Sequence, residues 1–67
     1  MSKFNNRHTY IYEFKPELRR AMYWNGGGWS DGRKRAKLYT SAEAEPIVRK
    51  MMLDHVHAKT GDIRTIR

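Results

Sequence analysis

The residues best suited to binding chemistry form a basic run at positions 33–37. The run reads Arg33-Lys34-Arg35-Ala36-Lys37, so four of its five side chains are cationic. Like charges this close repel one another, and an anionic partner would relieve the repulsion. Phosphate groups are the natural ligands of such a run, and their affinity for it would fall as the salt concentration rises. The competing interpretation is a solvated turn that keeps a small protein soluble.

Aromatic side chains are the second candidate for binding. The chain carries many for its length, namely Tyr10, Tyr12, Phe14, Tyr23, Trp24, Trp29 and Tyr39. On an open, basic sheet such rings stack against nucleic-acid bases. In a small domain, however, burial of large aromatic side chains dominates stability. The sequence therefore favours a core that contains Tyr10, Tyr12 and Phe14 beneath a helix. Ile11 would then lie on the opposite side of the same strand.

The segment between positions 19 and 29 supplies further contact residues. Trp24 and Trp29 flank a glycine-rich turn at 26–28, and whichever ring stays exposed is the better anchor for a partner. Arg19 and Arg20 join the basic run if the hairpin that carries them lies alongside it. The predicted binding set is Arg19, Arg20, Trp24, Trp29, Arg33, Lys34, Arg35 and Lys37.

Catalytic, metal and cofactor chemistry find no support in the residue pattern. The chain has no cysteine, which excludes disulfides, thiolate zinc sites and cysteine nucleophiles. His8, His55 and His57 lack the spacing of metal ligands, and no serine stands in a recognisable catalytic pattern. The glycines at 26–28 lack the Gly-Lys-Ser/Thr ending of a phosphate-binding loop and indicate a hairpin turn. We therefore expect no enzyme, no catalytic residue, no metal and no cofactor.

Length and charge limit the partners. The 67 residues leave room for one domain, covering 1–67, with 1–7 as a flexible lead-in. The net charge is +7, and residues 1–40 hold nine bases against three acids, a net +6. Such a positive field attracts nucleic acid, an anionic membrane or an acidic protein face. No apolar run approaches the roughly 20 residues that span a bilayer, so we expect no membrane partner. The lack of cysteine favours the cytoplasm.

Three short strands are predicted to position these residues. Residues 8–14 and 20–24 are rich in aromatic and β-branched side chains, and they read as an antiparallel pair connected through Pro16. Turn residues follow each other from 25 to 32 and lead to a third strand at 36–39. Gly61 suits a helix end or a turn, and residues 62–66 could form a last short strand.

Thr40 predicts the start of one helix. Thr40 and Glu43 have the spacing of a capping box. Apolar residues recur beyond them at helical spacing, at Ala44, Ile47, Val48, Met51 and Met52. Pro46 requires either a kink or a start nearer Glu45. The expected fold is α+β, with a small antiparallel sheet of three strands, or four with the last one, and one helix packed on one face. The order is strand, strand, strand, helix and, if residues 62–66 pair, a final strand.

Part of the chain resembles a known group of proteins. The matching segments are Tyr23-Trp24-Asn25-Gly26, Gly28-Trp29, Ala36-Lys37-Leu38-Tyr39 and Thr40-Ser41-Ala42-Glu43-Ala44. In this order they resemble a loose group of small, mostly uncharacterised proteins of bacteriophages and other mobile elements. In that group an aromatic-Asn-Gly hairpin turn precedes a Trp, and an Ala-Lys-aromatic strand leads into a helix. The resemblance covers roughly residues 8–56. It implies a small α+β fold and a phage context, hence the host cytoplasm, but no activity, ligand or catalytic residue.

Two functions compete at this level. The first is a phage-type binding protein that docks on an acidic face of a host protein and modulates or inhibits it. Trp24 or Trp29 would be the anchor, and the phage context comes from the resemblance. The alternative is nucleic-acid binding, in which the run 33–37 and the hairpin contact phosphates. The sequence leaves the oligomeric state open.

Overall fold

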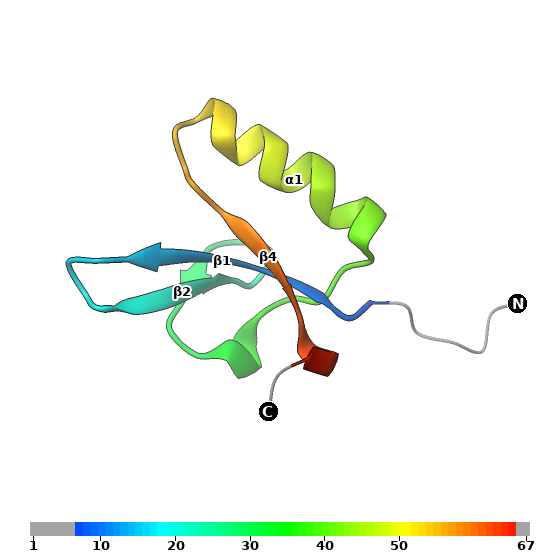
Figure 1. Cartoon of the computed structure of the whole chain (residues 1–67), viewed down its shortest axis with the longest axis horizontal. Helices are drawn as coiled ribbons and strands as arrows, with labels where there is room; N and C mark the ends of the chain where they lie inside the picture. The colour runs from blue at the N-terminus through cyan, green and yellow to red at the C-terminus, as the bar shows by residue number, and fades with distance from the viewer. Residues whose placement is uncertain (1–6, 66–67) are drawn as a thin grey trace, which may run out of the picture.

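The strands pair into an antiparallel sheet of order β3-β2-β1-β4 in the computed structural model, which describes residues 7–65. The elements are β1 (Thr9–Lys15), β2 (Arg20–Trp24), β3 (Trp29–Ser30), the 3-10 turn η1 (Arg33–Arg35), α1 (Ser41–Leu53), β4 (Lys59–Asp62) and the 3-10 turn η2 (Ile63–Thr65). α1 lies across one face of the sheet, while η1 and η2, green and red in Figure 1, lie on the opposite side. The predicted α+β fold is therefore confirmed.

Local chemistry sets the start of α1 where the sequence predicted it. The Glu43 backbone N–H donates to Thr40 Oγ1 at 3.0 Å, and the Thr40 N–H donates to Glu43 Oε1 at 2.9 Å, which completes the capping box. Pro46 lies inside the helix, so the alternative start near Glu45 is wrong. The helix loses one backbone hydrogen bond at Pro46 and still continues to Leu53. Packing of its apolar face against the sheet offsets that loss.

The third strand lies earlier than predicted. Trp29 pairs with Trp24, and Ser30 pairs with Tyr23, so β3 follows directly after the glycine turn. Asn25 Oδ1 accepts the N–H groups of the two glycines at 27 and 28, at 2.9 and 2.8 Å, which closes the turn tightly. The predicted strand at 36–39 is wrong, because in that segment Tyr39 alone makes a strand-like bridge, to Thr9.

The fourth strand also begins earlier than predicted. β4 covers Lys59–Asp62 and pairs with β1, whereas residues 63–65 turn into η2. Residue 66 lies outside the described residues. Gly61 is a strand residue and no helix cap, because α1 ends at Leu53 and the left-handed backbone follows at His55, with a φ of 64°. Of the predicted lead-in, Arg7 is described, and its Nη2 contacts Glu43 Oε2 at 3.1 Å.

The core lies on the opposite side of β1 from the predicted one. Ile11 has an exposed fraction of 0% and packs with Tyr39, Ala44 and Ala58 beneath α1. Partly buried apolar residues complete this layer, namely Trp24, Trp29, Ile47, Val48, Met51 and Val56. Tyr10, Tyr12 and Phe14 alternate with Ile11 and therefore lie on the other face.

The strand register explains this reversal. Tyr12 pairs with Tyr23, and paired residues in a sheet share a face. Trp24 is the next residue after Tyr23, so it falls on the face of Ile11, and its partner Trp29 does too. The two indoles supply the aromatic bulk that the sequence argument expected from Tyr10 and Tyr12. Within residues 7–65, no helix combines the length and apolar character needed to cross a bilayer.

Candidate functional site

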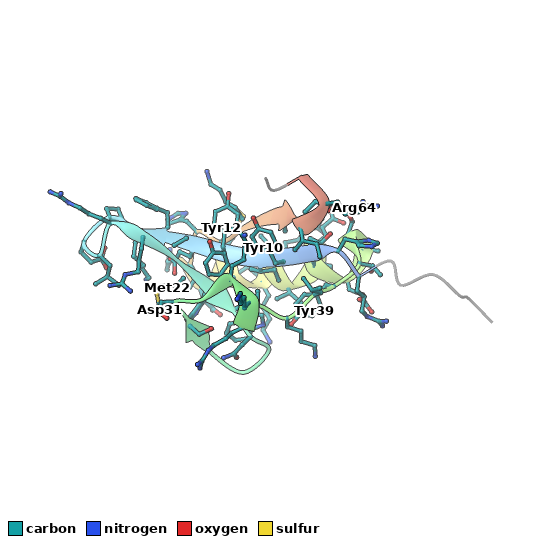
Figure 2. The ribbon with its side chains drawn as sticks, turned by 90° about the horizontal axis from the view of Figure 1, so that it is seen from below. Tyr10, Tyr12, Met22, Asp31, Tyr39 and Arg64 are labelled. Atoms are coloured by element: carbon teal, nitrogen blue, oxygen red, sulfur yellow. The ribbon has the colours of Figure 1, made fainter. Side chains whose placement is uncertain are left out.

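Three tyrosines cluster on the sheet face that α1 leaves uncovered. The ring centroids of Tyr10 and Tyr12 are 5.7 Å apart, those of Tyr10 and Tyr23 are 5.7 Å apart, and those of Tyr12 and Tyr23 are 6.3 Å apart. All three side chains are half-buried. Figure 2 looks onto this side, with Tyr10 and Tyr12 in front of the sheet and α1 behind it. We call the cluster of Tyr10, Tyr12 and Tyr23 the tyrosine face.

Gly61 in β4 lets the Tyr10 ring lie flat against the sheet. The two residues are cross-strand partners. A Cβ atom at position 61 would lie 2.6 Å from Tyr10 Cζ and from the hydroxyl oxygen, far inside contact distance. The glycine is thus required by a close approach of a ring to the backbone. One side of the Tyr10 ring is covered by β4, which holds the ring in place.

One strand residue beside the tyrosine face carries a positive charge. By register, Lys59 lies beside Tyr12, and Phe14 follows on the same face with 57% of its surface exposed. Among the described strand residues, the carboxylates of Glu13 and Asp62 belong to the opposite, helix-covered face. A phosphate that approaches the tyrosine face would therefore be attracted by Lys59. The described strands place no carboxylate on that face to repel it.

The 3-10 turn η1 brings most of the basic run to the same side. η1 packs against β2, and its residues Arg33, Lys34 and Arg35 are all exposed. Burial raises the pKa of Tyr10, as do the neighbouring Tyr23 and Tyr12 phenols, whereas the positive charge of Arg33 acts to lower it. η1 therefore sets three exposed cations on the side of the sheet that carries the tyrosine face (Figure 1).

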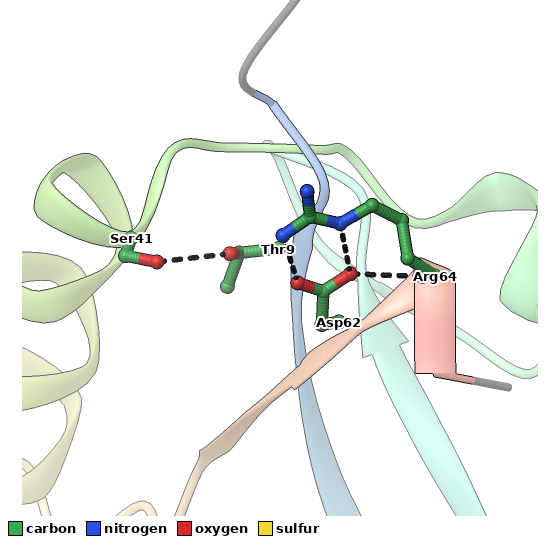
Figure 3. A network of polar contacts seen from close by, with 4 residues as sticks. All are labelled: Thr9, Ser41, Asp62 and Arg64. Carbon is green, nitrogen blue, oxygen red and sulfur yellow. Dashed lines mark hydrogen bonds and ion pairs between the residues drawn. The ribbon is translucent and has the colours of Figure 1, made fainter.

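Asp62 and Arg64 form an ion pair where the chain leaves β4 (Figure 3). Arg64 donates through Nη2 to Asp62 Oδ2 at 2.7 Å, and through Nε to Oδ1 at 3.1 Å. The Arg64 backbone N–H adds a bond to Oδ1 at 2.8 Å. The guanidinium, followed by the backbone N–H, lowers the pKa of Asp62 to about 2. Nearby, Thr9 Oγ1 and Ser41 Oγ lie 3.4 Å apart and connect β1 to α1.

The predicted binding residues do not gather in one patch. Trp24 and Trp29 contact each other edge to face, with centroids 5.3 Å apart, and pack against the core on the helix side. Lys37 also turns to the helix side, because its Nζ lies 5.6 Å from the ring centroid of Tyr39, which packs in the core beneath α1. The basic run is thus divided, with Arg33, Lys34 and Arg35 on one side and Lys37 on the other.

The two arginines of the first hairpin have different surroundings. Arg19 is an exposed turn residue with a left-handed backbone, at a φ of 54°. Arg20 Nη1 contacts Asp31 Oδ2 at 2.9 Å. This ion pair brings the hairpin next to the segment that leads into η1, and it also places a carboxylate beside the Arg20 charge.

Sequence reasoning did not assign the tyrosines or Lys59 to the binding set. The alternation of Tyr10 and Tyr12 was the available signal, and stacking on an open sheet was one interpretation of it. That interpretation could be chosen only once the register of β2 and β4 was known, because the register brings Tyr23 and Lys59 beside Tyr10 and Tyr12.

Other surfaces of the described residues offer less chemistry. A groove of about 790 Å³ lies between α1 and β4. Its charged lining includes Glu45 and Arg49, which pair with each other at 3.2 Å. Among residues 7–65, no three His, Asp or Glu side chains come together as metal ligands. The chain matches no family model, and it is significantly similar to no curated protein and to no solved structure.

Proposed function

We propose that this protein binds nucleic acid through the side of the sheet opposite α1. The observation that carries the proposal is that η1, with the exposed residues Arg33, Lys34 and Arg35, lies on the side of the sheet opposite α1. The tyrosine face and Lys59 belong to that side, while the strand carboxylates lie on the other face. Cations that flank an aromatic surface suit a phosphate backbone whose bases lie between them. The net charge of +7 adds long-range attraction for a polyanion.

Docking on an acidic host protein is the competing function. It depended on an exposed tryptophan as anchor, and Trp24 and Trp29 are both half-buried against the core. Buried anchors contribute less to a new interface than exposed ones. The phage context and the cytoplasmic location suggested by the resemblance are compatible with either function, so they favour neither.

The test compares two variants of equal net charge. In the first, Arg33, Lys34 and Arg35 are replaced together by alanine, which removes three charges beside the tyrosine face. In the control, Lys37→Ala, Arg49→Ala and Lys50→Ala remove three charges from the helix side. Both variants have a formal net charge of +4, because three of the seven excess charges are lost in each. The two variants therefore differ in the side of the molecule from which the charges are removed.

Binding is measured by fluorescence anisotropy with labelled single-stranded DNA, single-stranded RNA and duplex DNA. The salt concentration is varied from about 50 to about 200 mM, a range over which the affinity of a protein that makes many phosphate contacts falls about a thousandfold or more. Each phosphate contact contributes about −0.7 to the slope of log affinity against log salt for single strands. We expect the first variant to flatten that slope by about 2 and the control to change it little. Equal losses in both variants would show dependence on net charge alone and contradict the proposed surface. Lack of binding to all three probes would sink the function and favour an acidic protein partner.

A further inference from the structure

The geometry points to a specific ligand for the tyrosine face: we infer that unpaired bases of an extended single strand stack on Tyr10, Tyr12 and Tyr23. The inference rests on the proposed function, because the cations of η1 and β4 supply the phosphate contacts. It goes further in naming unpaired bases as the ligand. The consequence is a preference for single strands over duplexes.

The spacing of the three rings indicates that a bound strand is extended. The three centroids are 5.7 to 6.3 Å from one another, and the ring planes are tilted by 39° to 54°. Successive bases of a stacked strand in a duplex are about 3.4 Å apart. A strand whose bases reach two of these rings must therefore be extended, with its bases separated from one another. The tilts give each ring its own plane, so the rings suit separate bases better than a single continuous stack.

The residues around the three rings hold them in place before a ligand binds. Tyr10 is held against Gly61, and the three rings contact one another, so their positions are set before a ligand arrives. A preset aromatic surface costs little conformational entropy on binding. α1 covers the opposite face of the sheet, whereas only the short turns η1 and η2 among the described elements lie on the side of the tyrosine face (Figure 1).

The positions of the cations relative to the rings indicate the path of the phosphate backbone. η1 packs against β2, which carries Tyr23, and Lys59 lies in β4 on the far side of β1. The tyrosine face thus lies between cations on both sides along the strand order. A phosphate backbone that crosses the strands from η1 to Lys59 would carry its bases over the rings. The bases of a duplex are paired and stacked inside it, so a duplex would use the cations without the rings.

The experiment separates stacking from phosphate contacts at one position. Tyr12→Leu keeps an apolar side chain and removes the aromatic ring, whereas Tyr12→Phe keeps the ring and removes the hydroxyl. Stacking of a base on an aromatic side chain corresponds to about 5- to 150-fold in affinity. For single-stranded 12-mers we expect a loss in that range for Tyr12→Leu and less than about a twofold change for Tyr12→Phe. For duplex DNA we expect less than about a twofold change for either variant, since paired bases stay inside the duplex.

A second measurement uses the unaltered protein, in case a variant folds poorly. NMR spectra of the tyrosine ring protons are recorded with and without a single-stranded oligonucleotide, and stacked bases should shift these signals upfield. Matched DNA and RNA strands distinguish the two sources of unpaired bases. Binding with unchanged ring signals and an unaffected Tyr12→Leu variant would overturn the inference and leave the proposed function standing. Failure of every nucleic acid to bind would remove both.

Discussion

The side of β1 that forms the core is tested most directly at Ile11. Its side chain has an exposed fraction of 0% and lies beneath α1, whereas Phe14 on the opposite face is 57% exposed. Replacing Ile11 with valine removes one methylene from a packed site. Replacing Phe14 with leucine alters a larger side chain that mostly contacts solvent. The two variants therefore report which face of the strand is buried.

The magnitudes follow from burial. Ile→Val in a core costs about 0.5–1.5 kcal/mol of unfolding free energy, and Ile→Ala about 2–5 kcal/mol. A surface replacement such as Phe14→Leu stays within about 0.5 kcal/mol. Domains of this size rarely exceed about 3–5 kcal/mol of stability. Ile11→Val should thus fold with a melting temperature lower by roughly 4–8 °C per kcal/mol, and Ile11→Ala should be largely unfolded.

Urea and thermal unfolding, followed by tryptophan fluorescence and circular dichroism, measure these changes. The indoles of Trp24 and Trp29 pack against the core on the side of Ile11, so their emission reports on that layer. If Phe14→Leu costs more than about 1 kcal/mol while Ile11→Val is neutral within about 0.5 kcal/mol, then α1 covers the tyrosine side and the assignment of the core is wrong.

Three further changes test single contacts. Gly61→Ala should displace the Tyr10 ring at a cost of about 1 kcal/mol, because the new Cβ would lie 2.6 Å from it; the Tyr10 ring proton signals in NMR spectra measure the displacement. Thr40→Ala should cost about 1 kcal/mol through loss of the N-cap, which urea unfolding measures. Arg64→Ala should raise the pKa of Asp62 from about 2 toward its ordinary value of 3.8, measured by the pH dependence of its carboxyl carbon shift. Since the folded pKa of Asp62 is the lower one, its stabilising effect is present above pH 3.8 and is lost as the pH falls through about 2.

Each of these changes has its own control. Unmoved Tyr10 signals in Gly61→Ala would show that the ring does not lie on the β4 backbone. Thr40→Ser keeps the hydroxyl, so it should behave like the native protein, and a loss equal to that of Thr40→Ala would argue against the cap. Arg64→Lys keeps the charge without the forked donor, so the Asp62 pKa should rise less than in Arg64→Ala. An unchanged pKa in both variants would contradict the ion pair.

Binding that depends on the tyrosine face would give a simple division of labour in this small chain. α1 and the indole pair stabilise one side of the sheet, and the proposed ligand would bind on the other. The same β1 strand serves both, with Ile11 facing the core and Tyr10 and Tyr12 facing out. One point of contact between the two roles is Gly61, where β4 supports the Tyr10 ring.

Features that depend on neighbours along the chain can be predicted from the sequence. The capping box at Thr40 and Glu43 involves residues three apart, so its spacing alone predicts the helix start. β2 matches its predicted bounds at 20–24, and β1 differs by one residue at each end, because their aromatic and β-branched residues favour extended backbone. The α+β class follows from this order of elements.

Which face of the sheet is covered, and which cations lie on the side of the rings, depends on contacts between residues far apart in the sequence. Alternation along β1 divides its side chains into two sets, but either set could face a helix until Tyr12 pairs with Tyr23 and brings Trp24 to the side of Ile11. Likewise, the run 33–37 is one basic cluster in the sequence. It becomes two because the chain passes beside β2 after η1, where the Lys37 N–H bonds to the Trp24 carbonyl. Such long-range pairings depend on the register between strands, which no local pattern encodes.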